Sequence, residues 1–117
     1  MAIQKIEKSK WGAFLAGISD ALIGKRAELE VASLDLGDQI LADRLPLLAI
    51  SYDPKNDLIS VNLERVDHLI RAPRELYVDY ALAGLTCLDI IDGEGAHQIL
   101  KLSDPLALPE PETRSAG

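Results

Sequence analysis

Residues 9–23 carry apolar side chains at helical spacing. They are Trp11, Phe14, Leu15, Ile18 and Leu22, at i, i+3, i+4, i+7 and i+11. This spacing places them along one side of an α-helix. Ser9 can cap the first turn of that helix, and Gly24 suits the left-handed residue that often follows the last turn. Because the only Trp and the only Phe of the chain lie in this stripe, we expect the helix to pack into the main core.

After Gly24 the apolar positions alternate, which is typical of β-strands with one solvated face. The alternation predicts strands at residues 26–33 and 58–63, and a continuous apolar run predicts another at residues 47–52. Asp53, Pro54 and Asn56 supply the turn residues between the last two of these segments. The sequence therefore predicts a hairpin over residues 47–63.

A second hairpin is predicted in the C-terminal half. Two apolar segments, residues 85–91 and 97–102, flank the turn sequence DGEG at residues 92–95. Residues 76–79 precede them and have the composition of a further strand.

Two segments have ambiguous patterns. Residues 39–44 fit either a short strand or an irregular edge. Residues 64–72 are predicted to form a turn of helix at most, because their apolar residues have helical spacing and Pro73 follows. Those apolar residues are Val66, Leu69 and Ile70.

Together these elements predict an α+β fold in which the N-terminal helix packs on a curved, mostly antiparallel sheet of about five to six strands. Such a sheet could also curl into a small open barrel, and the sequence does not decide between the two forms. A chain of 117 residues is expected to form one domain. We assign residues 1–102 to that domain and residues 103–117, with three prolines, to a Pro-rich C-terminal tail.

Composition narrows the classes of partner and compartment. Nineteen acidic residues against twelve basic ones give a net charge of −7, which disfavours nucleic acid as a partner. The lone Cys87 cannot form an internal disulfide, which fits a reducing compartment. The N-terminus lacks the apolar run of a signal peptide, and no segment reaches the roughly 18 apolar residues of a membrane span. We therefore expect a cytoplasmic protein without a membrane partner.

The densest group of charged and titratable side chains lies between residues 67 and 80. Its members are Asp67, His68, Arg71, Arg74, Tyr77 and Asp79. Guanidinium groups bind carboxylates and phosphates, and histidine titrates near neutral pH. The sequence therefore predicts a ligand- or partner-binding site here. In the purely structural alternative, Asp67 caps a short helix and pairs with Arg71 four residues later.

Catalytic and metal-binding patterns are absent from the sequence. His68 and His97 are the only histidines, and their spacing does not place two ligands on one element. Cys87 lies in an apolar strand, where a thiol is seldom activated, and pairing it with His97 leaves no third group to orient the histidine. We assign no catalytic residue, no metal and no other cofactor.

Three function hypotheses follow. The first is a non-catalytic interaction or assembly domain that self-associates or binds another protein, because strand edges and one sheet face are left uncovered. The alternative is a small-barrel RNA binder, since Sm-like proteins also have a helix followed by about five curved strands. The weakest is a small hydrolase or metal enzyme that uses His68 and His97.

Several short strings occur in an order that resembles a bacterial protein family. They include DLGDQ (35–39), ISYDPK (50–55), DHLI (67–70), PRE (73–75) and HQIL (97–100). From Trp11 to Pro109 the chain resembles a family known only as a domain of unknown function, number 5335 in that series. Two positions depart from the family pattern: Arg44 replaces an aromatic residue, and Tyr80 replaces an acid. The resemblance implies membership without a mechanism, and a family function at either position would be altered here.

Overall fold

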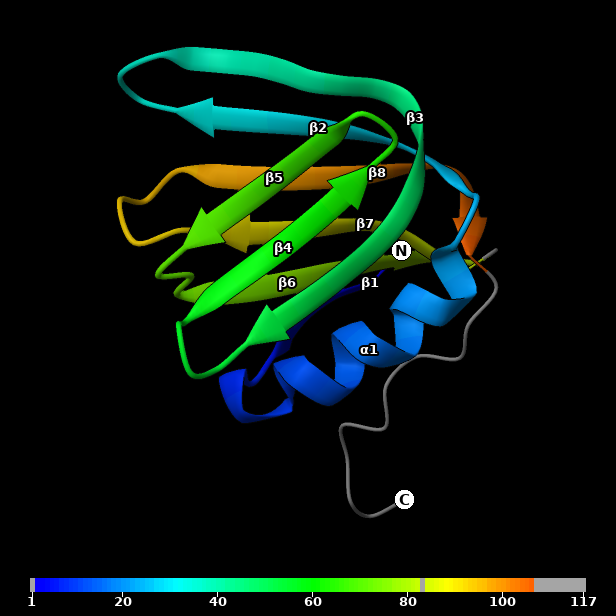
Figure 1. Cartoon of the computed structure of the whole chain (residues 1–117), viewed down its shortest axis with the longest axis horizontal. Helices are drawn as coiled ribbons and strands as arrows, with labels where there is room; N and C mark the ends of the chain where they lie inside the picture. Colours follow the sequence, from blue (N-terminus) through cyan, green and yellow to red (C-terminus); the bar gives the residue numbers. More distant parts are fainter. Residues whose placement is uncertain (1, 83, 107–117) are drawn as a thin grey trace.

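The computed structural model describes residues 2–82 and 84–106. In this part of the chain, eight strands form one antiparallel sheet, and two helices lie between the first and second strands (Figure 1). The helices are η1 (Lys8–Lys10), a 3-10 helix, and α1 (Trp11–Leu22). The strands are β1 (Ala2–Ile6), β2 (Arg26–Ser33), β3 (Gly37–Asp53), β4 (Leu58–Leu63), β5 (Val66–Arg71), β6 (Glu75–Ala81), β7 (Gly84–Ile91) and β8 (His97–Leu106).

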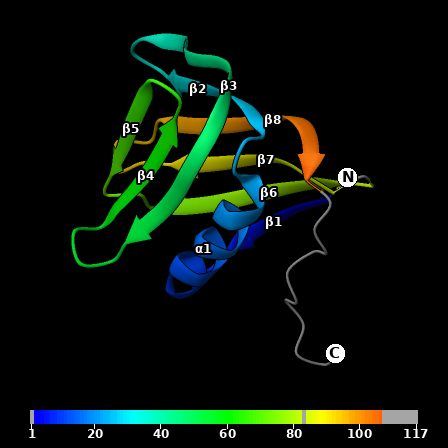
Figure 2. The same ribbon diagram turned by 45° about the vertical axis from the view of Figure 1, so that its right-hand side comes forward.

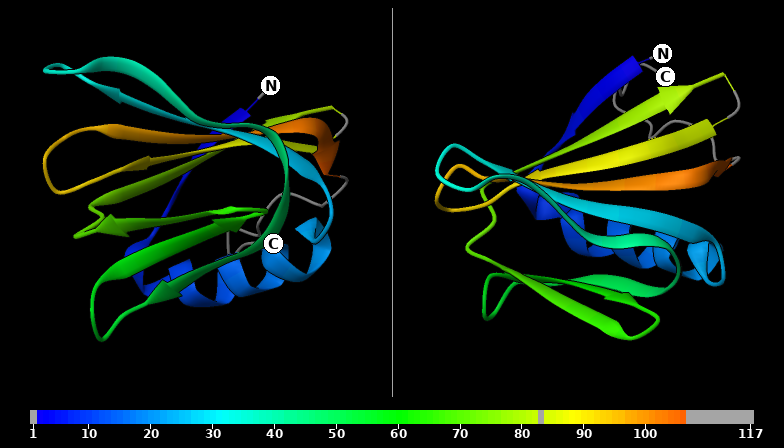
Figure 3. Two further views of the ribbon diagram at one scale, coloured as in Figure 1. Left: turned by 45° about the horizontal axis from the view of Figure 1, so that its top comes forward. Right: turned by 90° about the horizontal axis from the view of Figure 1, so that it is seen from above.

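The sheet folds over itself through its longest strand, β3. The strand order is β1-β6-β7-β8-β2-β3-β4-β5. The first half of the 17-residue β3 pairs with β2, and the second half pairs with β4. Figures 1 and 3 show that the second half of β3, with β4 and β5, crosses over the remaining strands. We call these three segments the front layer and the remaining strands the back layer.

The predicted α+β class is wrong, and so is the sheet of five to six strands. The described chain is mostly β, with one short α-helix and a 3-10 turn beside eight strands. Residues 39–44, which were ambiguous, continue β3. β1 precedes the helix and pairs with β6, a contact too distant in sequence for local periodicity to report. β5 replaces the predicted turn of helix, because backbone pairing with β4 outweighs the local spacing of Val66, Leu69 and Ile70.

The two predicted hairpins are confirmed as β3–β4 and β7–β8. In the first turn, Asp53 Oδ1 accepts the Lys55 N–H at 3.0 Å, and Asp53 Oδ2 accepts the Asn56 side-chain amide at 2.7 Å. In the second turn, Asp92 Oδ1 accepts two backbone N–H groups. Each turn is thus held by its leading aspartate.

α1 lies between β1 and the second half of β3, where it covers one side of the core (Figure 2). Its buried residues are Trp11, Leu15, Ile18 and Leu22. Phe14, predicted in the same stripe, is only partly buried. The predicted cap at Ser9 is wrong. Ser9 belongs to the 3-10 helix η1, and α1 begins after it, at Trp11. Gly24 follows the helix with φ +85°, as predicted.

Trp11 anchors this helix to two strands. Its indole N–H donates to the Ile6 carbonyl at 2.8 Å. Its ring meets Tyr52 edge-on, with the ring centroids 5.2 Å apart. Together with the backbone N–H of Ile50, which donates to Ser19 Oγ at 3.1 Å, these contacts fix α1 against the sheet.

At the C-terminal end, β8 continues to Leu106. Residues 107–117 of the predicted tail lie outside the described residues, so the tail stays a prediction. None of the described helices has the length and apolar character needed to cross a membrane.

Candidate binding site

β5 forms one end of the sheet and carries half of the predicted site. It pairs with β4, and no other strand of the described residues lies against it. Its residues alternate, so that His68 and Ile70 face the core while Asp67, Leu69 and Arg71 are exposed.

The backbone of β5 presents unpaired groups along its free edge. The Ala72 N–H donates to the Asp57 carbonyl at 3.0 Å. In an antiparallel pair, residues alternate between bonding across the pair and pointing away from it. The two-residue turn that joins Leu63 to Val66 requires the same alternation. The N–H and C=O groups of Asp67, Leu69 and Arg71 therefore point away from β4.

Behind β5, a chain of hydrogen bonds connects the two layers. His68 Nε2 lies 2.7 Å from Gln98 Oε1, and Gln98 Nε2 donates to Asp92 Oδ2 at 2.9 Å. Because Gln98 Oε1 only accepts, His68 Nε2 carries the proton of this bond. Gln98, 7% exposed, is the one buried polar residue of the described chain. The layers thus meet through a satisfied polar contact.

Asp92 is held in its charged form. Burial alone would raise the pKa of its carboxyl group, but hydrogen bonds from Gln98 and from three backbone N–H groups outweigh burial. The pKa of Asp92 consequently lies below its ordinary value.

A shallow pocket of about 400 Å³ opens between the end of β5 and the β7–β8 turn. Its wall includes Leu69 and Arg71 from β5, Asp92 and Glu94 from the turn, and Gln98 from β8. The turn approaches β5 so closely that a Cβ on Gly93 would lie 3.1 Å from the Ala72 side chain and carbonyl. A side chain at this position of the turn would therefore fit only if Ala72 moved by a few tenths of an ångström.

The structure places Asp67, His68, Arg71 and Arg74 on β5 or just after it, and all of them except Arg71 hydrogen-bond to other described residues. Arg74 Nε donates to the Asp92 carbonyl at 3.1 Å, and Asp67 accepts the Asn62 amide at 2.9 Å. Arg71 makes no hydrogen bond or ion pair with any described residue. The predicted helix cap and i+4 pair of Asp67 with Arg71 are wrong, because four residues of a strand span about 13 Å.

Tyr77 and Asp79 lie elsewhere, on the outer face of β6. The Tyr77 hydroxyl donates to Glu75 at 3.0 Å, and this hydrogen bond, followed by burial, raises the pKa of Tyr77. Asp79 Oδ1 is buried without a hydrogen-bond partner among the described residues. The sheet itself separates these two side chains from His68.

The two histidines, His68 of β5 and His97 of β8, lie on opposite sides of the back layer. His68 meets Gln98 on the inner face, whereas His97 Nδ1 lies 2.9 Å from Asp89 Oδ2 on the outer face. They therefore do not form one site. Within residues 2–82 and 84–106, no three His, Cys, Asp or Glu side chains gather as metal ligands.

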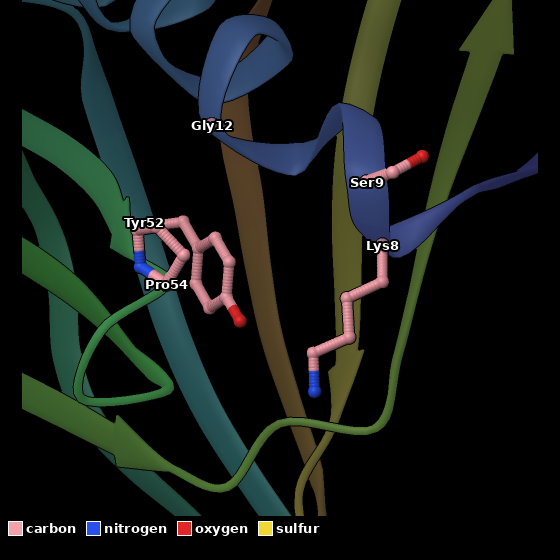
Figure 4. Close-up of a pocket in the computed structure, with 5 residues that line it drawn as sticks. All are labelled: Lys8, Ser9, Gly12, Tyr52 and Pro54. Atoms are coloured by element: carbon pink, nitrogen blue, oxygen red, sulfur yellow. The ribbon is translucent and has the colours of Figure 1, made fainter.

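A second pocket, of about 350 Å³, lies at the start of α1 (Figure 4). Lys8 and Tyr52 line it and converge on Asp57, with Lys8 Nζ and the Tyr52 hydroxyl 2.9 and 2.8 Å from Asp57 Oδ1. Lys8 also donates to the Pro73 carbonyl at 2.9 Å. These groups bind one another, so they act as a clamp between chain segments.

The clamp shifts the pKa values of its members in opposite directions. Burial, with help from Asp57, raises the pKa of Tyr52 to about 12. Lys8, followed by Tyr52, lowers the pKa of Asp57. The lowered pKa of Asp57 follows from an anion held between two donors, whereas the raised pKa of Tyr52 is due first to burial.

Gln98 and Asp92 were not predicted as site residues, although the sequence carried a signal for Gln98. It occupies an inward position that alternates with Leu100 and Leu102. A polar residue at such a position needs a buried partner. The partner itself, His68, is 30 residues away in the chain.

Comparison with known proteins agrees with the resemblance seen in the sequence. The model of the "Family of unknown function (DUF5335)" matches residues 2–111. The chain belongs to DUF5335. An uncharacterized protein of Aquifex aeolicus (strain VF5) is 36% identical to this DUF5335 member over 111 residues, which cover 94% of this chain and 100% of the relative. No solved structure matches the chain.

Proposed function

We propose that this chain is a non-catalytic binding domain that holds a partner at β5 and the adjoining pocket. The observation that carries the proposal is the state of β5, an edge strand whose outward backbone groups and exposed Arg71, beside the pocket, have no partner within residues 2–82 and 84–106. Exposed strand edges and free guanidinium groups are both common means of binding a partner.

The titratable groups beside β5, and the Cys87 thiol on β7, support a binding role over a catalytic one. His68 and Asp92 are both engaged by the buried Gln98, which fixes their positions. Burial raises the pKa of the Cys87 thiol to about 11, so the thiol stays protonated near neutral pH. The RNA-binding alternative loses the analogy on which it rests, because seven strands follow the helix in the described chain.

The proposal is tested by titrating isotope-labelled protein with phosphate, citrate and short acidic peptides while the backbone amide shifts are followed. We expect the acidic peptides to move the amides of residues 67–72 and 92–98 selectively. Arg71→Ala should remove this response, and Arg65→Ala, which removes an exposed Arg at the other end of β5, should retain it. Shifts that are absent, or that spread evenly over every Lys and Arg, would overturn the proposal.

A further inference from the structure

The exposed side of β5 has a charge pattern along its free edge. Asp67, Leu69 and Arg71 share the exposed face, so an apolar side chain lies between an anion and a cation. Leu69 is 45% exposed. Their N–H and C=O groups are also the ones that point away from β4. One stretch of chain thus offers backbone pairing and side-chain recognition together.

The other edge strand, β1, lacks this combination. Its single charged residue, Lys5, already lies 3.6 Å from Glu75. With one charge of one sign, β1 lacks the pair of opposite charges by which β5 could set the direction of an incoming strand.

The back layer is uncovered beside the free edge of β5. Val31 pairs with Gln98 on one side and with Gln39 on the other, so the three side chains form a row on the inner face. Gln98 lies beneath β5 and is buried, but Val31 is only partly buried and Gln39 is exposed. Figure 1 shows the β2–β3 hairpin extending past β5 on this side. The front layer therefore ends before the back layer does.

We infer that the partner is an extended peptide that adds to the sheet as an antiparallel strand beside β5, with an acidic residue opposite Arg71 and a basic residue opposite Asp67. The inference rests on the proposed function and specifies its partner. Strand addition of this kind takes affinity from main-chain hydrogen bonds and specificity from alternate side chains.

The register follows from the backbone of β5. Partner residues opposite Asp67, Leu69 and Arg71 can each exchange a pair of N–H···O=C bonds. Residues opposite His68 and Ile70 face inward, toward the uncovered side of Val31, and should be apolar. Because the strands are antiparallel, the peptide reads acidic–apolar–apolar–apolar–basic from its N-terminus.

A second copy of this chain fits the edge poorly. Two antiparallel strands are related by a two-fold axis perpendicular to the sheet, so both front layers would lie side by side with both back layers behind them. Each back layer extends past β5 (Figure 3), and the two would occupy the same space. A single strand has no such layer behind it.

The experiment compares two peptides with the same composition, TEVLVKT and TKVLVET, in binding to the isotope-labelled full chain. We expect TEVLVKT to bind with a Kd at least about tenfold lower, since the reversed peptide sets like charges opposite each other. On binding, the amide hydrogens of Asp67, Leu69 and Arg71 should exchange more slowly. Those of His68 and Ile70, which already bond to β4, should be unchanged.

Two variants provide controls. The double variant D67K/R71E should invert the preference between the peptides. Leu69→Pro should abolish binding of both, because proline removes an edge-facing N–H and is tolerated on an edge strand.

The outcomes separate the inference from the proposed function. Equal affinities, or unaltered exchange at Asp67, Leu69 and Arg71, would overturn strand addition. The proposed function would still stand if acidic peptides gave the Arg71-dependent shifts described above. A dimer of the free chain that Leu69→Pro dissociates would show that the occupant is a second copy, which also overturns the inference. If β5 responds to no ligand, both proposals fail.

Discussion

The Cys87 thiol illustrates how burial controls a single side chain. With a pKa of about 11, about one thiol in a thousand is ionised at pH 8, against about a quarter for a free cysteine. The greater nucleophilicity of a high-pKa thiolate recovers about a factor of ten. We therefore expect iodoacetamide to alkylate Cys87 at least about tenfold more slowly than glutathione at pH 8. A rate equal to that of glutathione in the folded protein would contradict this, and unfolding in urea should restore it.

The Lys8–Asp57 ion pair should make part of the stability depend on pH. Because the pKa of Asp57 is lowered in the folded state, its contribution is present above the unfolded value of about 3.9 and is lost as pH falls toward the folded pKa. Lys8→Met should unfold at lower urea than the parent at pH 7, and part of this difference should disappear between about pH 5 and pH 3.

Lys10→Met is the matched control, because Lys10 forms no ion pair with a described residue. It should leave the urea midpoint unchanged across the same pH range. A difference between Lys8→Met and the parent that is constant with pH would show that the other contacts of Lys8, with Pro73 and the Trp11 ring, account for all of its effect.

The sequence identified candidate site residues by their type, but it could not show which side chains contact them. Arg71 and His68 were identified because they are charged or titratable against an acidic background. Alternation along β5 separates them onto two faces, which a helical interpretation of the segment could not show. The contact of His68 with Gln98 joins two strands that are not neighbours in the sheet, so no local pattern encodes it.

At the scale of one element, Gly17 and Gly24 should respond oppositely to the same substitution. A Cβ at either position would meet nothing within 4 Å, but Gly24 has φ +85° while Gly17 is helical. Gly17→Ala should raise the free energy of unfolding by about 0.5–1 kcal/mol, because alanine loses less entropy in a helix. Gly24→Ala should lower it by about 1 kcal/mol or more.

Urea unfolding of the two glycine variants tests this pair. Shifts of the midpoint in the same direction would mean that backbone conformation does not determine the effect. Because neither new methyl group would contact a neighbour, differences in packing cannot explain a rise in stability for one variant and a fall for the other.

Whole elements were predictable where periodicity and turn chemistry agreed. The β3–β4 hairpin combines strand alternation with an Asp-Pro-Lys-Asn turn, and both features are local. β5 was mistaken because Val66, Leu69 and Ile70 all fit helical spacing, whereas only Val66 and Ile70 fit the alternation of a strand. Only the pairing of Leu63 with Val66 across a two-residue turn decides between helix and strand. β1 was missed because its five residues include Gln4 and Lys5, which obscure a strand pattern.

At the scale of the molecule, we predict that the chain beyond Leu108 contributes little to stability. The motive is the proline spacing of residues 103–117 and their lack of apolar periodicity. Truncation after Leu108 should change the thermal midpoint by less than about 5 °C, which corresponds to about 1 kcal/mol for a domain of this size. Truncation after Leu102 removes the β8 segment that pairs with Leu85 and should lower the midpoint further. A large loss on the first truncation would contradict the prediction.

The arrangement of the strands was beyond the reach of the sequence. β1 pairs with β6 and β2 pairs with β8, so strands at the beginning of the chain depend on partners near its end. Such pairs form only when distant parts of the chain come together, and periodicity within a segment carries no information about which strands will pair.

Because β3 passes from one layer to the other, the two parts of the sheet should unfold locally in a definite order. In the sheet order, β4 and β5 are joined to the rest of the sheet through β3 alone, whereas β7, β8 and β2 each have two strand neighbours within the back layer. Loss of pairing between β3 and β4 would therefore release β4 and β5 as a unit while the back layer stays paired. In native-state deuterium exchange, the amides that join β4 to β5 should behave as a separate cooperative unit with a lower opening free energy than those of β7 and β8. A bound strand beside β5 would then protect the part of the protein that opens first.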